Sequence, residues 1–241
     1  MLFDDDDEPN LIMIKTVLIG DSGVGKTSII KQFSTGEFDP ECISSISGQY
    51  NSKKMKVYDK EIKLDLWDTA GQDRYRSLAK IFYQDAKIIV FVYDITSIKS
   101  FEGLQKYWYK QVQANSDKNA ILAVVGNKSD LYLNEQIKTE DGKNFADSIG
   151  AIFQTTSAKS NVGIDLLFNH VVKKYLDPSF DYKKDEEKEK ELYNAKKNNK
   201  KKEKKEKTEK KDNSFNENDT SFSSVKLYND FVKKNNNRYC C

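Results

Sequence analysis

Most of the strands that the sequence predicts coincide with short apolar runs, each of the length of a β-strand. Residues 11–20 (LIMIKTVLIG) are almost continuously apolar, which is typical of a strand buried in a parallel sheet. Residues 62–67 (IKLDLW) instead place Ile62, Leu64 and Leu66 at alternate positions, as in a strand with one buried face. The pattern predicts strands at 12–19 and near 50–58, 61–67, 87–93, 120–126 and 151–155.

Helical patterns separate most of these strands. Residues 27–36 (TSIIKQFSTG) follow the first strand, and residues 100–112 (SFEGLQKYWYKQV) have the apolar spacing of an amphipathic helix. The aromatic residues 107–109 are also of a kind that stacks on nucleic-acid bases, but their helical spacing favours packing on a sheet. Because only the second and third strands are closely linked, we expect an α/β fold with a six-stranded, mostly parallel sheet, one antiparallel strand, and helices on both faces.

Composition divides the chain into three parts. Residues 1–10 form an acidic extension, residues 11–178 have the apolar content of a globular domain, and residues 179–241 do not. Between 183 and 211 there are fourteen lysines, eight acidic residues and almost nothing apolar to bury. Disorder is therefore the prediction for this Lys/Glu/Asn-rich tail. Because the acidic residues dilute its basic field, we interpret it as a solvated spacer and expect no nucleic-acid partner.

The three cysteines are distributed unevenly, since Cys42 is followed only by Cys240 and Cys241 at the last two positions. The sequence has no signal-peptide pattern and no apolar run of about 20 residues, so we expect the protein in the cytosol. Thiols stay reduced there, which disfavours a disulfide. A single pair of cysteines is also a poor zinc site. A covalent anchor is the remaining interpretation.

A glycine-rich segment directly follows the first predicted strand. Residues 20–27 (GDSGVGKT) match the pattern G-x-x-x-x-G-K-[ST] between a strand and a helix, which indicates a phosphate-binding loop rather than a chance glycine turn. Backbone N–H groups of such a loop and the following helix N-terminus converge on phosphate oxygens. Lys26 can reach the β- and γ-phosphates, and the Thr27 hydroxyl can bind Mg²⁺. The predicted nucleotide contacts in this segment are Asp21, Ser22, Gly23, Val24, Gly25, Lys26, Thr27 and Ser28.

The third predicted strand ends in residues 68–72 (DTAGQ). A carboxylate at the end of a strand beside a phosphate loop is well placed to hold Mg²⁺, so Asp68 is a candidate metal ligand. A role as a turn or helix-cap residue is the alternative for Asp68. Gly71 can donate its amide to a γ-phosphate, and Gln72 can orient an attacking water.

Two later motifs indicate the base. Residues 127–130 (NKSD) follow a buried strand, and the Asp130 carboxylate can accept hydrogen bonds from the ring N–H and the exocyclic amine of guanine. Adenine offers no such pair. Asn127 can brace the loop and contact the base, and the Lys128 stem can lie along the purine face. Residues 157–159 follow the last strand, with the Ala158 N–H available to the guanine oxygen between Ser157 and Lys159.

Together these motifs resemble the signature set of the Ras-like small GTPases. Residues 64–86, residues 88–108 and the terminal cysteine pair resemble the Rab family in particular, and residues 43–46 (ISSI) are most similar to its early-endosomal branch. The resemblance covers residues 11–178 and the last two residues. It implies a P-loop NTPase G domain that cycles between GDP and GTP, hydrolyses GTP, and recruits effectors in vesicle traffic.

The resemblance also implies roles for individual residues. Mg²⁺ would be bound by Thr27, Asp68 and Ser45, where the family usually has Thr; Phe38 would pack edge-on against guanine. Lys26 and Gln72 would be the catalytic residues. No arginine is firmly placed to reach the γ-phosphate, so we expect slow intrinsic hydrolysis and an activating protein that supplies one. Because of the Ser45 departure, a nucleotide-binding interaction module with little hydrolysis stays open as the alternative.

The terminal Cys240 and Cys241 then fit double prenylation. One lipid chain gives marginal, reversible membrane binding, whereas two give stable anchoring. The resemblance implies an escort or GDP-dissociation-inhibitor protein, an exchange factor and effectors as further partners. The expected location is the cytosol and the cytoplasmic face of an intracellular membrane, with an endosomal membrane as one candidate.

Overall fold

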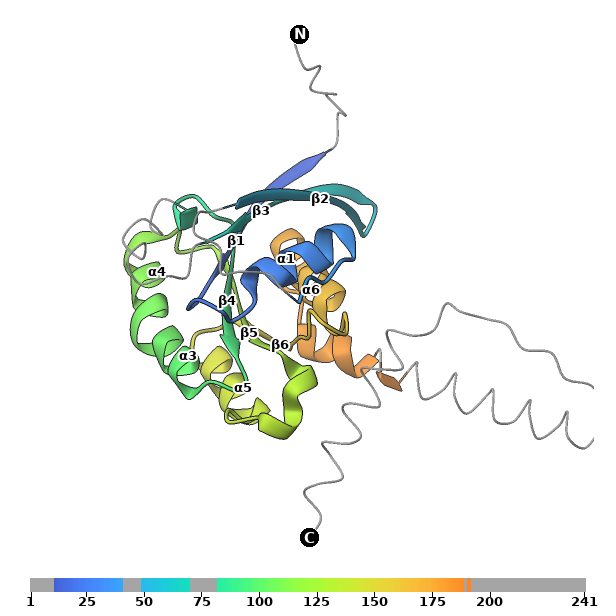
Figure 1. The fold of residues 1–241 in the computed structure, drawn as a ribbon. Coiled ribbons are helices and arrows are strands. Elements are labelled where there is room, and N and C mark those ends of the chain that lie inside the picture. Colours follow the sequence, from blue (N-terminus) through green and yellow to red (C-terminus); the bar gives the residue numbers. More distant parts are fainter. Residues whose placement is uncertain (1–10, 41–48, 70–81, 189, 192–241) are drawn as a thin grey trace, which may run out of the picture. The chain divides into compact units, whose positions relative to one another are not determined.

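The computed structural model describes residues 11–40, 49–69, 82–188 and 190–191. The chain divides into two units, residues 1–178 and residues 179–241. The candidate site belongs to the first unit, whose described residues form the fold shown in Figure 1. The strands are β1 (Ile12–Ile19), β2 (Gln49–Val57), β3 (Lys60–Asp68), β4 (Ile88–Asp94), β5 (Ile121–Asn127) and β6 (Ile152–Thr155). The helical segments are α1 (Lys26–Thr35), α3 (Ile98–Gly103), η2 (Leu104–Trp108), α4 (Tyr109–Asn115), η3 (Ser129–Asn134), α5 (Thr139–Ser148) and α6 (Ile164–Leu176).

The six strands form one sheet in the order β2-β3-β1-β4-β5-β6. β2 and β3 are antiparallel and joined by a two-residue turn at 58–59, whereas every other neighbouring pair is parallel. This confirms the predicted α/β fold with one antiparallel strand. β1 has the predicted bounds, and the ends of the other strands lie within one residue of the prediction.

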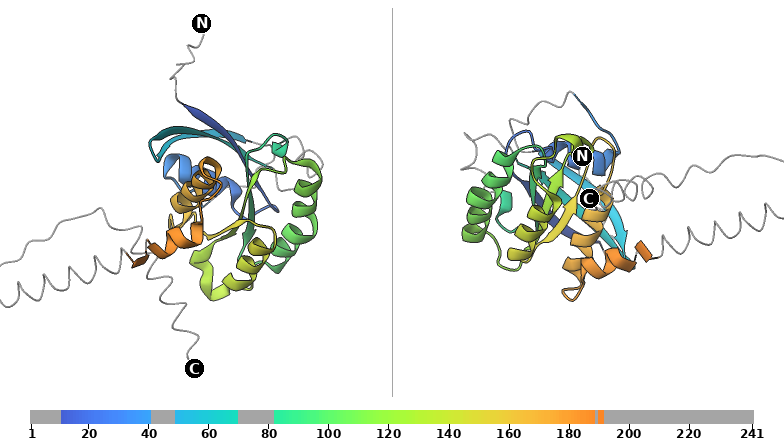
Figure 2. Two further views of the ribbon diagram at one scale, coloured as in Figure 1. Left: turned by 180° about the vertical axis from the view of Figure 1, so that it is seen from behind. Right: turned by 90° about the horizontal axis from the view of Figure 1, so that it is seen from below.

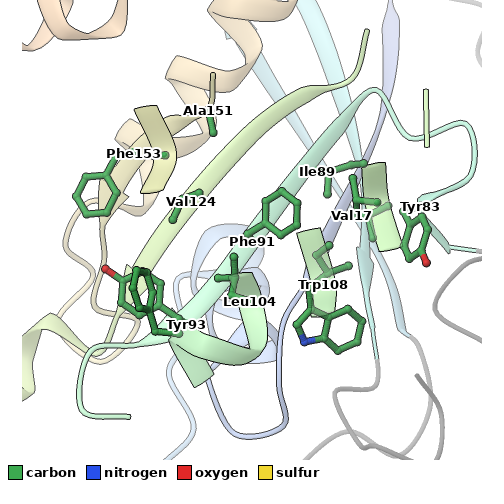
Figure 3. Packing of buried hydrophobic residues seen from close by; sticks show 14 of the residues in the cluster. Val17, Tyr83, Ile89, Phe91, Tyr93, Leu104, Trp108, Val124, Ala151 and Phe153 are labelled. Carbon is green, nitrogen blue, oxygen red and sulfur yellow. The ribbon is translucent and has the colours of Figure 1, made fainter. Parts of the chain in front are cut away.

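Helices cover both faces of the sheet. α1 and α6 lie on one face, and α3, α4 and α5 lie on the other (Figures 1 and 2). The central strand β4 is buried at every position, which explains its unbroken apolar sequence. On the second face Val17, Phe91 and Val124 from the strands pack against Leu104 and Trp108 from the helical layer (Figure 3).

α3, η2 and α4 follow one another without a break in helical backbone conformation, but η2 is a π-helical turn. The Trp108 side chain at the end of η2 is 0% exposed and belongs to the core. This confirms that the aromatic residues 107–109 belong to a helix packed on the sheet. Within the described ranges, none of the helices combines the length and apolar character that crossing a bilayer requires.

Candidate nucleotide-binding site

The described residues of the predicted phosphate, metal and base motifs lie at one edge of the sheet. β1, β3, β4, β5 and β6 all run parallel, so their carboxyl ends lie at the same edge. The phosphate loop, residues 20–27, follows β1, Asp68 and Asn127 end β3 and β5, and Ser157 comes just after β6. Ligands of open α/β sheets bind at such an edge.

The phosphate loop curls around the side chain of Lys26. Its Nζ donates hydrogen bonds of 2.9 Å to the carbonyl oxygens of Gly20 and Asp21, and the side chain is 5% exposed. Burial lowers the pKa of Lys26 to about 8, although the negative charges of Asp68 and Asp21 act in the opposite direction. The ammonium is therefore held inside the loop, at the N-terminus of α1, where an anion is attracted.

Thr27 and Asp68 bring two oxygen ligands together. Thr27 Oγ1 donates a hydrogen bond of 2.5 Å to Asp68 Oδ2, and Asp68 is 1% exposed. The following residue is fixed because Thr69 Oγ1 donates to the Leu18 carbonyl oxygen at 2.8 Å. Mg²⁺ prefers oxygen ligands and commonly takes only one or two carboxylates together with phosphate and water. The Thr27 hydroxyl and the Asp68 carboxylate therefore fit Mg²⁺ bound jointly with a nucleotide.

The described residues hold no group of three or more His, Cys, Asp or Glu side chains that could bind a metal ion by themselves. A magnesium ion at Thr27 and Asp68 would thus depend on further oxygen atoms. The nucleotide phosphates are of the right chemistry to supply them.

Asn127 bridges the phosphate loop and the end of β6. Its Nδ2 donates to the Val24 carbonyl oxygen at 2.8 Å, and its Oδ1 accepts a hydrogen bond of 3.0 Å from Thr156 Oγ1. The side chain is 2% exposed. The amide also occupies the space beside Gly25, where an added Cβ would lie 2.3 Å from Nδ2 and where the backbone has a φ of 96°. Only glycine fits there without strain.

Asp130 is oriented by the segment that follows β6. Ser157 Oγ donates a hydrogen bond of 2.6 Å to Asp130 Oδ1 and accepts one of 3.1 Å from the backbone N–H of Ser160. Ser157 and its neighbour Ala158 are buried, whereas Lys159 is exposed. The two motifs predicted to contact guanine are thus joined through side chains.

Asp94, the ion-pair partner of Lys128, was not among the site residues predicted from the sequence. Lys128 adopts a left-handed conformation (φ 65°), and its Nζ pairs with Asp94 Oδ2 at 2.7 Å. Asp94 ends β4, next to Asn127 in the register of the sheet, and its Oδ1 accepts hydrogen bonds from the backbone N–H and hydroxyl of Thr96. An acidic residue at the end of a buried strand was the available signal, since the same reasoning identified Asp68.

Some of the remaining predicted residues are described by the structure, and the others lie outside the described ranges. Asp21, Ser22 and Gly23 lie in the phosphate loop and Ser28 in the first turn of α1, whereas Phe38 lies beyond the end of α1 and is 36% exposed. Several predicted residues lie outside the described part of the chain, namely Ser45, Gly71, Gln72, Cys240 and Cys241.

Residues 15–177 match the Ras family model. Ras-related protein Rab11B of Nicotiana tabacum is 39% identical over 66% of this chain and 73% of its own length. Ras-related protein Rab5A of Oryza sativa subsp. japonica is 38% identical over 67% of this chain and 79% of its own length. Ras-related protein RABA1c of Arabidopsis thaliana is 39% identical over 69% and 76%.

The identities to Rab11B and Rab5A are nearly equal, so the assignment to the early-endosomal branch stays a prediction. The family itself follows from the extent of the match. It spans more than half of the chain, and each of these relatives is covered over more than two thirds of its length. The chain belongs to the Ras family and, within it, to the Rab-related small GTPases.

Proposed function

We propose that the chain binds GTP and GDP together with Mg²⁺ at the carboxyl edge of its sheet and hydrolyses GTP to GDP and phosphate. One observation carries the proposal: the four motifs of the site are joined to one another by the pairs Thr27–Asp68, Val24–Asn127 and Asp130–Ser157. As a Rab-related small GTPase the protein regulates vesicle traffic, and its family binds guanine nucleotide and acts through regulators and effectors.

Base recognition would depend on Asp130. Its carboxylate accepts hydrogen bonds from the guanine ring N–H and exocyclic amine, and the bond from Ser157 fixes the direction in which it points. Adenine presents an acceptor where guanine presents the ring N–H, so ATP would leave a carboxylate facing a lone pair. The Lys128–Asp94 ion pair supports placement of the Lys128 stem along the purine.

Phosphate binding would change the partners of Lys26. Its ammonium donates hydrogen bonds to two loop carbonyl oxygens, and burial lowers its pKa to about 8. Bound phosphates favour the charged ammonium, which then neutralises charge on the β- and γ-phosphates. Mg²⁺, held by Thr27 and Asp68, would supply further neutralisation of the same oxygens.

Hydrolysis would proceed by in-line attack. The oxygen of a water oriented by Gln72 bonds to the γ-phosphorus, and the bond from this phosphorus to the β–γ bridging oxygen breaks. The attacking water gives up a proton to a γ-phosphate oxygen, and GDP and phosphate leave. We propose that Gly71 donates its amide to the γ-phosphate and that Ser45 completes the Mg²⁺ ligands, so that loss of this phosphate releases both segments. An activating protein supplying an arginine would accelerate the step.

Membrane attachment is a separate part of the proposal. Prenyl groups on Cys240 and Cys241 would anchor the protein to the cytoplasmic face of an intracellular membrane. Two lipid chains give stable membrane binding, whereas a single chain gives only marginal, reversible binding. An escort or GDP-dissociation-inhibitor protein would deliver it, and an exchange factor would load it with GTP. Effectors would then bind the GTP form.

The test combines a nucleotide panel with single-turnover hydrolysis. We expect GTP to bind far more tightly than ATP, and ITP, which lacks the exocyclic amine, to bind with intermediate affinity. Asp130→Ala should abolish the difference between GTP and ITP, because the carboxylate is the group that senses the amine. Gln72→Leu should slow hydrolysis without preventing GTP binding. Tight GTP binding with no hydrolysis above background, no response to activating proteins and no effect of Gln72→Leu would favour the interaction-module alternative.

A further inference from the structure

The phosphate loop carries a carboxylate, and a tryptophan distant in the sequence holds it. The indole Nε1 of Trp108 donates a hydrogen bond of 2.9 Å to Asp21 Oδ1, across 87 residues of sequence. Trp108 is fully buried between the sheet and its helical layer (Figure 3). A buried indole N–H usually finds a hydrogen-bond partner, and here that partner belongs to the loop that would bind phosphate.

Two features of the helical segment accompany the contact between Trp108 and Asp21. Trp108 ends the π-helical turn η2, and such turns inserted in α-helices are rare and often occur at functional sites. Gly103, the residue before η2, faces the same carboxylate. A Cβ added to Gly103 would lie 2.8 Å from Asp21 Oδ2, closer than such atoms approach one another in proteins. Both oxygens of the Asp21 carboxylate therefore lie against this helical segment.

A carboxylate in this loop needs such a partner on electrostatic grounds. The loop amides and Lys26 attract phosphate, whereas a free negative charge among them repels it. The backbone of Asp21 is also part of the site, because its carbonyl oxygen accepts the 2.9 Å hydrogen bond from Lys26 Nζ. A rotation of Asp21 would move both its charge and this carbonyl.

We infer that Trp108 is a positioning residue for the phosphate loop: its indole N–H holds the Asp21 carboxylate against Gly103 and η2, away from the phosphates. The same bond fixes the Asp21 backbone and with it one of the carbonyl groups that bind Lys26. Trp108 touches neither nucleotide nor metal in this role. The inference rests on the proposed function, since it concerns the affinity of the proposed nucleotide site.

The test is a double-mutant cycle on the GDP dissociation rate, measured on the full chain loaded with GDP and Mg²⁺. Trp108→Phe keeps most of the ring volume and removes the N–H donor. We expect it to accelerate GDP release about tenfold, as the loss of one hydrogen bond to a charged group would. When Asp21→Ala is already present, Trp108→Phe should cause no further acceleration, because the charge that it releases is absent.

Salt gives a second measure that simple loss of packing would not change. The screening length falls from about 10 Å at 0.1 M salt to about 3 Å at 1 M. The acceleration caused by Trp108→Phe should therefore shrink at high salt, since it comes from a carboxylate that repels phosphate.

Val112→Ala is the matched control. Val112 is a buried residue of α4 in the same helical layer, so its truncation removes packing without touching the indole hydrogen bond. It should lower the melting temperature and leave GDP release unchanged. Equal acceleration by Trp108→Phe with and without Asp21→Ala, or the same acceleration at 1 M salt, would overturn the inference alone. Wild-type protein that retains no GDP would overturn the proposed function and the inference with it.

Discussion

Replacement of Asn127 by alanine should weaken both the fold and nucleotide retention. The side chain is buried and links the Val24 carbonyl oxygen, at 2.8 Å, to the Thr156 hydroxyl, at 3.0 Å. Asn127→Ala removes both hydrogen bonds at once. The phosphate loop and the segment after β6 would then lose the side chain that joins them.

The expected loss of unfolding free energy depends on whether the Val24 carbonyl and the Thr156 hydroxyl can find other hydrogen-bond partners. A buried group left without its hydrogen bond costs about 1–3 kcal/mol, and an ordinary hydrogen bond contributes about 1 kcal/mol net. The Val24 carbonyl is fixed by the loop and should cost about 2 kcal/mol, whereas the Thr156 hydroxyl can rotate and should cost about 1 kcal/mol. We therefore expect Asn127→Ala to lower the free energy of unfolding by about 3 kcal/mol. Because the bridge holds the phosphate loop, GDP release should be at least about tenfold faster, which corresponds to about 1.4 kcal/mol.

The assay is urea unfolding at one fixed GDP and Mg²⁺ concentration, together with GDP release from preloaded protein. The nucleotide concentration must stay fixed because bound ligand adds to apparent stability. Thr156→Val is the matched control, since it removes only the Thr156 bond and keeps the side-chain volume. It should lose about 1 kcal/mol of unfolding free energy. If Asn127→Ala changed the free energy of unfolding by less than about 0.5 kcal/mol and left GDP release unchanged, the bridge would have no energetic role.

Three further predictions concern other parts of the molecule. With a pKa of about 8, Lys26 loses its proton above pH 8 when no phosphate is bound, whereas bound phosphates require the charged ammonium. The affinity for GDP should therefore be constant below pH 7.5 and fall by up to about tenfold per pH unit above pH 8. Calorimetry in two buffers should show proton uptake on binding, and an affinity that stays constant up to pH 10 would contradict this prediction. Tyr93→Phe should raise the unfolding free energy by about 1 kcal/mol, because the buried Tyr93 hydroxyl has no hydrogen-bond partner among the described residues; a loss of stability in thermal unfolding would reveal one. A tagged Cys240→Ser/Cys241→Ser variant should be diffuse in the cytosol where the wild type marks a membrane compartment in microscopy, and equal distributions would exclude the lipid anchor.

Much of the fold could be predicted because strand positions depend on local pattern. The unbroken apolar run around Phe91 and Val92 has no other stable place than the middle of a parallel sheet, and both are fully buried in β4. The meeting of Thr27 and Asp68 was also predictable, since each follows or ends a strand and parallel strands end at one edge.

Contacts that depend on register and helix phase could not be predicted. The hydrogen bonds from Asn127 to Val24 and from Trp108 to Asp21 join residues 103 and 87 positions apart. The partner of Asn127 depends on the path that the phosphate loop takes beside the end of β5, and the partner of Trp108 depends on how far its helix is rotated against the sheet. For Trp108 that rotation includes the π-helical turn, which nothing in the apolar spacing of residues 100–112 indicates.

Because of the position of Trp108, the intrinsic tryptophan fluorescence of the protein should report on the proposed nucleotide site. The chain has two tryptophans, and both lie close to residues of the proposed nucleotide site, Trp108 to Asp21 and Trp67 to Asp68. Trp108 contacts the phosphate loop, while Trp67 precedes Asp68 and packs between the rings of Tyr50 and Phe82, with ring centroids 5.3 and 6.0 Å away. Indole emission responds to nearby charge and polarity. Nucleotide exchange and the order in which the two sides of the site respond can therefore be followed in unlabelled protein by comparing wild type with a Trp67→Phe variant.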